Sequence, residues 1–216
     1  MKMCSSGLAP RRRQGGFIQG AILFALVIIA VVVAAFSLAN RDSQSSADSE
    51  QARVNASFVL KVGNDLQTGV NRAIADGFAP ANLEDQMFFD GTDSDGTKLN
   101  LFDSTLKYMV RPQFPTTALV DPDVQPFLDG TNDAAWDVTS IDGVGGAEAD
   151  AVVTVTGLKE DVCKRINVTA NGVLVSADLP SAIDTGDSVG WREGCYESGT
   201  DFVYFRVVAT DVAPAT

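Results

Sequence analysis

The sequence predicts an α+β protein, with one long helix at the N-terminus and a small antiparallel sheet in the remainder. Apolar residues first form an uncharged run at residues 17–39 and then recur every three or four positions up to Asp76, which is the spacing of a helix. Residues 151–156, which are rich in β-branched side chains, predict a strand, and residues 202–209 predict another, which pairs across a short turn with the residues around Cys195.

The composition excludes several classes of function. The chain has 216 residues, 45% of them hydrophobic, with 16 Lys and Arg against 28 Asp and Glu and a formal net charge of −12. This acidic balance argues against nucleic-acid binding, because phosphate recognition needs a basic surface. The absence of histidine excludes Ser-His-Asp and Cys-His catalysis and argues against a zinc site. No other pattern indicates catalysis, so the sequence predicts that the protein is not an enzyme.

Residues 17–39 predict a membrane-spanning helix. At 1.5 Å per residue this run would be about 34 Å long, enough for a hydrocarbon core of about 30 Å. Four basic and no acidic residues precede position 40, whereas residues 40–216 carry a net charge of −16. This asymmetry predicts a cytoplasmic N-terminus and an external body. The alternative is a secretory signal cut after Ser37-Leu38-Ala39, although secretory apolar regions usually have about 7–15 residues.

A glycine pair joins the basic leader to the apolar run, in the order Gln14-Gly15-Gly16-Phe17. This junction resembles the processing site of type IV prepilins and type II secretion pseudopilins. The resemblance implies that a prepilin peptidase cuts between Gly16 and Phe17, removes residues 1–16 as a cytoplasmic leader and methylates the new N-terminal Phe. The apolar helix would then survive and enter a filament core. Glycine suits the site because it has no side chain to obstruct an extended cleavage strand.

Position 21 departs from the pattern of that family. The fifth residue of the mature chain is usually Glu, which pairs with the N-terminal ammonium of a neighbouring subunit in the filament core, but here it is Ala21. An unpaired ammonium in apolar surroundings is costly. The departure resembles the pseudopilin at the tip of type II secretion filaments, and it indicates a minor or tip subunit as a secondary interpretation.

Residues 40–76 predict an amphipathic continuation of the helix. Residues 40–49 are polar and Ser-rich, which fits either a helix emerging into solvent or a flexible joint. Beyond them, apolar residues at intervals of mostly three and four predict one buried stripe. Its members are Val54, Phe58, Val59, Val62, Leu66, Val70, Ala73 and Ile74. Gly77 is placed to cap the helix in a left-handed conformation, and the resemblance implies that this half packs on the sheet of a globular head at residues 77–216.

The C-terminal third contains two cysteines on predicted regular elements. Residues 158–167 predict a helix that carries Cys163, and Cys195 lies at the start of the hairpin. Outside the cytoplasm, two cysteines in one domain most economically form a disulfide, which would contribute about 3–4 kcal/mol in the chain-entropy model. The placement resembles the C-terminal disulfide-bounded region of type IV pilins. Before these elements, residues 111–133 contain four prolines and predict an irregular surface segment.

One of the acidic loops contains a candidate metal site. Asp90, Asp93 and Asp95 lie in a segment whose Asp-x-Asp-Gly sequence matches the middle of an EF-hand loop, but Gly91 occupies the place of the first ligand. Calcium bound by these three carboxylates is one interpretation, and a solvated acidic turn is the other. No further cofactor is predicted.

The resemblance implies a structural role, as a subunit of a type IV pilus-like or type II secretion filament that polymerises through its N-terminal helix. Its partners would be copies of itself or other pilin-like subunits, the prepilin peptidase and the inner-membrane assembly machinery. The precursor would cross the bacterial inner membrane once, and the mature protein would reach a periplasmic or cell-surface filament. The alternative is a signal-anchored periplasmic or extracellular binding module that does not polymerise.

Overall fold

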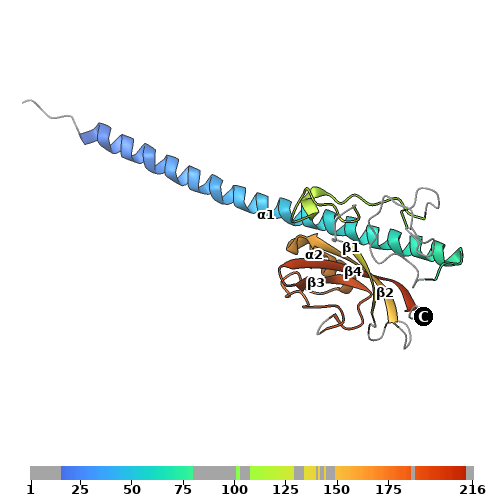
Figure 1. Cartoon of the computed structure of the whole chain (residues 1–216). Helices are drawn as coiled ribbons and strands as arrows, with labels where there is room; N and C mark the ends of the chain where they lie inside the picture. Colours follow the sequence, from blue (N-terminus) through green and yellow to red (C-terminus); the bar gives the residue numbers. More distant parts are fainter. Residues whose placement is uncertain are drawn as a thin grey trace, which may run out of the picture. The chain divides into compact units, whose positions relative to one another are not determined.

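The computed structural model describes residues 16–79, 101–102, 108–128, 134–139, 141, 144, 149–185 and 188–212 (Figure 1). Its helices are α1 (Gly16–Ala75) and α2 (Glu160–Asn171), and a 3₁₀ turn, η2, covers Thr116–Ala118. Its strands are β1 (Ala134–Thr139), β2 (Ala149–Leu158), β3 (Glu193–Ser198) and β4 (Asp201–Val212). Side chains of α1 are described at Ile29 and from Ala47 onward, and those of β1 at Ala134 and Ala135. The chain divides within α1 into two units, Met1–Asp48 and Ser49–Thr216.

The predicted leader and membrane-spanning run fall largely outside the described residues. Residues 1–15 are not among them, and of the side chains at 17–39 only that of Ile29 is. Within the described part of the chain, no helix combines the length and the apolar character that a membrane crossing requires. The membrane-spanning role of residues 17–39 therefore stays a prediction. The backbone at residues 40–49, which the sequence left open, is part of α1.

In the second unit, α1 buries a stripe of small and aliphatic side chains. Five predicted members are buried, namely Val59, Val62, Leu66, Val70 and Ala73, and they are joined by Ala52 and Ala56. The prediction was wrong for Val54, which is 62% exposed, because it lies two residues from both alanines and so points to the opposite face of the helix. It was also wrong for Ile74, which is 37% exposed in the last turn. Phe58 is half-buried against the core.

The end of α1 is a Schellman motif built on the predicted glycine. Gly77 has a φ of +99°, its N–H donates to Ile74 O at 3.0 Å, and the N–H of Phe78 donates to Ala73 O at 3.1 Å. These bonds satisfy carbonyls that the helix would otherwise leave unpaired. The predicted cap at Gly77 is thus confirmed, with the last helical residue at Ala75 and not at Asp76.

The sheet is antiparallel, with the strand order β1-β2-β4-β3. The predicted strand at 151–156 lies within β2, and the predicted hairpin is β3–β4, in which Ser198 pairs with Asp201 across a turn. Gly199 adopts a φ of +66° in that turn, which glycine tolerates best. The helix predicted at 158–167 is α2, although Leu158 is the last residue of β2 and the helix starts at Glu160.

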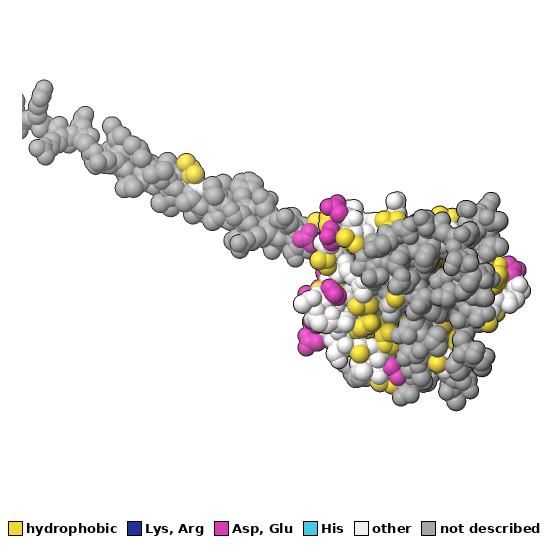
Figure 2. All heavy atoms as spheres, in the orientation of Figure 1, with side chains coloured by type: hydrophobic (Ala, Val, Ile, Leu, Met, Phe, Trp, Pro, Cys, Tyr) yellow, Lys and Arg dark blue, Asp and Glu magenta, His cyan; other side chains and the backbone are white. Residues whose placement is uncertain are grey.

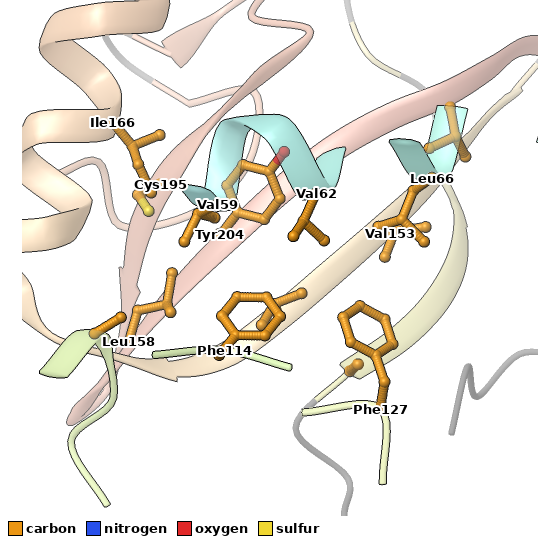
Figure 3. Packing of buried hydrophobic residues seen from close by; sticks show 14 of the residues in the cluster. Val59, Val62, Leu66, Phe114, Phe127, Val153, Leu158, Ile166, Cys195 and Tyr204 are labelled. Carbon is orange, nitrogen blue, oxygen red and sulfur yellow. The ribbon is translucent and has the colours of Figure 1, made fainter. Parts of the chain in front are cut away.

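Side chains of β2 and β4 alternate between the two faces of the sheet, as strand geometry requires. On one face, Val153 and Tyr204 join the main core together with the buried stripe of α1 and with Ile166 of α2 (Figure 3). On the other face, Val152 and Phe205 belong to a smaller cluster. In the second unit, α1 therefore packs on an antiparallel sheet, which confirms the α+β fold class.

The proline-rich segment is irregular as predicted, but it is not confined to the surface. Phe114 and Phe127 are 3% and 0% exposed, and they point into the main core below α1 (Figure 3). Phe114 makes an edge-to-face contact with Phe58, with ring centroids 5.7 Å apart, and Leu119 forms an isolated bridge with Leu158. Burial of these aromatic side chains offsets the absence of a regular hydrogen-bond ladder.

Candidate functional site

The predicted processing and metal residues are described only in part. Gly16 is the first residue of α1, and Phe17 and Ala21 follow in the same helix, but their side chains lie outside the described residues. The proposed calcium ligands Asp90, Asp93 and Asp95 also lie outside them. Among the residues that the structure does describe, no group of three His, Cys, Asp or Glu side chains could hold a metal ion.

The predicted disulfide is present between α2 and β3. Cys163 and Cys195 are bonded, with their Cα atoms 5.3 Å apart, and both side chains are fully buried. Val162 and Ile166 flank Cys163 and bury the same face of α2 against the main core. The predicted pairing of Cys163 with Cys195 is confirmed.

Two asparagines hold α2 on β3 beside the disulfide. Asn167 is 2% exposed; its amide donates to Cys195 O at 2.9 Å, and its Oδ1 accepts from the N–H of Cys195 at 2.7 Å. Asn171 donates to Glu193 O at 2.8 Å. The strand can approach so closely because Gly194 has no side chain, since a Cβ there would lie 2.8 Å from the Trp191 ring and 3.1 Å from Asn167 Oδ1. No periodic pattern in the sequence indicates this clamp.

A polar network joins α1 to β3 and β4 at the edge of the main core. Arg206 of β4 pairs through Nη1 with Glu193, and its Nη2 donates to Asn64 Oδ1 at 2.9 Å and to Gln67 Oε1 at 2.6 Å. Tyr204 donates to Glu193 Oε1 at 2.5 Å. The side chains of Arg206 and Glu193 are only 13% and 14% exposed, so each charge depends on the other.

The same network requires a glycine in α1. A Cβ added at Gly63 would lie 1.8 Å from the hydroxyl oxygen of Tyr204 and 2.9 Å from Glu193 Oε1. Figure 3 shows the Tyr204 ring directed toward α1 between Val59 and Val62. Gly63 therefore provides the space in which the tyrosine hydroxyl meets the helix.

Burial changes the acid–base behaviour of this network. It raises the pKa of the Glu193 carboxyl above 4.5, and this effect outweighs the lowering by the Tyr204 hydrogen bond and by Arg206. Burial, followed by the charge and hydrogen bond of Glu193, raises the pKa of Tyr204 well above 10.0. The tyrosine thus remains a neutral donor at physiological pH.

The raised pKa of Glu193 predicts a pH-dependent cost for its replacement. The folded protein binds the proton more tightly than the unfolded chain, so this contribution to stability is complete below pH 4.5 and is lost as pH rises through the folded-state pKa. We therefore expect Glu193→Gln to lower the free energy of unfolding below that of the wild type by less at pH 7 than at pH 4. Urea unfolding across this range measures the difference, with the exposed Glu197→Gln on the same strand as control. A loss that grows toward pH 7 would contradict the prediction.

An open groove of about 300 Å³ lies next to this network. Its lining comes from α1, α2, β3, β4 and the residue just before β3, and it comprises Gln67, Ala170, Asn171, Arg192, Glu193, Arg206 and Val207. Two guanidinium groups and two amides among these side chains make it suited to binding an anionic group. Sequence reasoning missed it because its residues are scattered over 140 positions, from Gln67 to Val207. The chain matches no protein-family model, no curated protein and no solved structure.

Proposed function

We propose that the chain is a structural subunit, without catalytic activity, of a type IV pilus-like or type II secretion filament. The observation that carries the proposal is α1, one helix from Gly16 to Ala75 that contains both the apolar run and the stripe that packs on the sheet. The apolar run would cross the inner membrane in the precursor and would pack among neighbouring helices in the filament.

The second unit supports an external location. A buried disulfide links α2 to β3, and disulfides persist in the periplasm and at cell surfaces but rarely in the cytoplasm. The excess of acidic over basic residues beyond position 40 suits a head domain that remains on the outer side after the basic leader is retained in the cytoplasm.

The mature N-terminus decides whether the chain follows the prepilin pathway. In a host that has a prepilin peptidase, we expect intact-mass analysis and N-terminal sequencing of sheared surface material to give a chain that begins at Phe17 and is heavier by one methyl group. Gly16→Leu should block this cleavage and keep the protein out of the surface material, because the added side chain obstructs the cleavage strand. Gly7→Leu makes the same replacement nine residues before Gly16 in the leader, and as the matched control it should still be cut. A wild-type chain that begins at Met1 or at Asn40 would overturn the proposal.

Ala21 favours a second candidate, a signal-anchored binding module that never polymerises. No acidic residue precedes Asp42, so the N-terminal ammonium of a neighbour would have no carboxylate near position 21 to pair with. Within the filament proposal, the same feature favours a minor or tip subunit. The two candidates differ in the test above, because an anchored module would remain in membranes whether or not position 16 is glycine.

A further inference from the structure

The groove beside the polar network is positively charged in an otherwise acidic protein. Its lining includes two arginines and one glutamate, which leaves one net positive charge. The glutamate is already engaged, because Glu193 pairs with Arg206 and accepts the hydrogen bond of Tyr204. An incoming group therefore meets guanidinium and amide donors rather than a free carboxylate.

Arg192 is available to a partner. Its backbone oxygen accepts from the N–H of Val207 at 2.8 Å, which fixes its position beside β4. Four basic side chains are exposed in the described residues, namely Arg53, Lys61, Arg72 and Arg192. The first three have a carboxylate or a backbone oxygen as partner, whereas the side chain of Arg192 makes neither a hydrogen bond nor an ion pair with the described part of the chain.

Arg206 adds a second, partly satisfied guanidinium to the groove. Its Nη1 and Nη2 atoms are paired with Glu193, Asn64 and Gln67, but its buried Nε has no hydrogen-bond partner among the described residues. A buried donor without a partner is unfavourable. A carboxylate in the groove would attract the positively charged guanidinium of Arg206 electrostatically, even without accepting a hydrogen bond from Nε.

The chain itself carries the complementary charge. It has 28 acidic residues against 16 basic ones, and Figure 2 shows Asp and Glu side chains on a face where no described Lys or Arg is visible. Because each copy has a net charge of −12, two copies repel each other at long range, so a basic groove is where a neighbour can approach favourably. Contact between an acidic surface and a different, basic groove is heterologous, and repeated heterologous contacts build open filaments when the rotation between copies does not close a ring.

We propose that the groove formed by Gln67, Asn171, Arg192 and Arg206 binds a carboxylate side chain of a second copy of this chain. The inference rests on the proposed function, because it describes how the heads of neighbouring filament subunits contact each other. Arg192 supplies the accessible charge, Arg206 the fixed charge, and Gln67 and Asn171 the flanking amides.

Carbodiimide cross-linking of the full-length protein in detergent tests the contact directly. Arg192→Lys places a primary amine in the groove, and a water-soluble carbodiimide joins such an amine only to a carboxylate in contact with it. In an equal mixture of ¹⁵N-labelled and unlabelled copies, we expect mixed-isotope peptides that link position 192 to one Asp or Glu. Links confined to a single copy, or no link at position 192, would overturn the proposal.

Charge reversal provides an independent measurement of the same contact. We expect Arg192→Glu to raise the dissociation constant for self-association, measured by sedimentation in 50 mM salt, by about tenfold. Arg53→Glu changes the net charge equally at an exposed site about 21 Å away along α1 from Gln67, and it should leave self-association near the wild-type value. Equal effects of the two variants, or a wild-type protein that stays monomeric, would overturn the proposal. Failure of Phe17 processing with normal self-association would instead overturn only the filament function.

Discussion

Replacing Gly63 with alanine is expected to lower the free energy of unfolding by about 2–4 kcal/mol. The new methyl group would lie 1.8 Å from the Tyr204 hydroxyl, so either α1 must move from the sheet or the tyrosine must leave Glu193. Displacing the tyrosine deprives a carboxylate that is only 14% exposed of a hydrogen bond. The better helix propensity of alanine returns only about 1 kcal/mol. Urea unfolding of the full chain in mild detergent, followed by tryptophan fluorescence, measures the change.

Gly69 offers a matched control in the same helix. A Cβ there would lie 3.4 Å from Met109 Cβ and 3.6 Å from Tyr108 O, which are tolerable distances, so Gly69→Ala should change stability by no more than about 1 kcal/mol. Adding Tyr204→Phe to Gly63→Ala removes the clashing oxygen, so the double variant should be more stable than the sum of the single effects indicates. Additive single effects would show that the tyrosine hydroxyl is not what the glycine accommodates.

Removing the disulfide with Cys163→Ala and Cys195→Ala together is expected to cost about 3–4 kcal/mol of unfolding free energy. The bond closes a loop across 32 positions of sequence separation, and without it the unfolded chain regains conformational freedom. The double alanine variant is preferred to serine because both sites are fully buried, where an unpaired hydroxyl would add its own penalty.

The urea midpoint of this double variant should fall, and a reductant should then have no effect on it. The wild-type protein, once reduced in urea, should show nearly the same midpoint as the variant. Asn167 and Asn171 still join α2 to β3 in the variant, so α2 should remain folded at low urea. An unchanged midpoint in the double variant would show that these two clamps, and not the disulfide, fix α2 to the sheet.

The parts of the fold that could be predicted depend on local pattern. The stripe from Val59 to Ala73 and the cap at Gly77 follow from helical spacing and glycine stereochemistry, both of which are properties of neighbouring residues. The hairpin follows from the β-branched and aromatic run at residues 202–209 and from the short turn that precedes it. The same spacing rule failed at Val54, because the stripe at that level is formed by alanines, which a search for large apolar residues overlooks.

The parts that could not be predicted depend on contacts between distant residues. Arg206 and Asn64 are 142 positions apart in the chain, and no local pattern shows that an arginine in an apolar strand faces an asparagine on a helix. Gly63 is unfavourable for a helix, and the reason for it is apparent only from the Tyr204 hydroxyl, which occupies the space that a Cβ at position 63 would need. The prolines between 112 and 126 predicted that this segment is irregular and that it lies on the surface. The first prediction is confirmed and the second is wrong, because Phe114 and Phe127 are buried. An irregular segment can cross a core when its aromatic side chains fill the space.

The asparagine clamp on β3 has a consequence for covalent modification. Asn167 begins the tripeptide Asn-Val-Thr, which has the Asn-x-Ser/Thr form of an N-glycosylation acceptor. In the folded protein its side chain is 2% exposed, and both polar atoms of its amide are bonded to the backbone of Cys195. A glycosyl transferase cannot reach this nitrogen without separating α2 from β3. The acceptor sequence therefore cannot be glycosylated once the chain has folded. A sugar attached to Asn167 before folding would prevent β3 from packing beside α2.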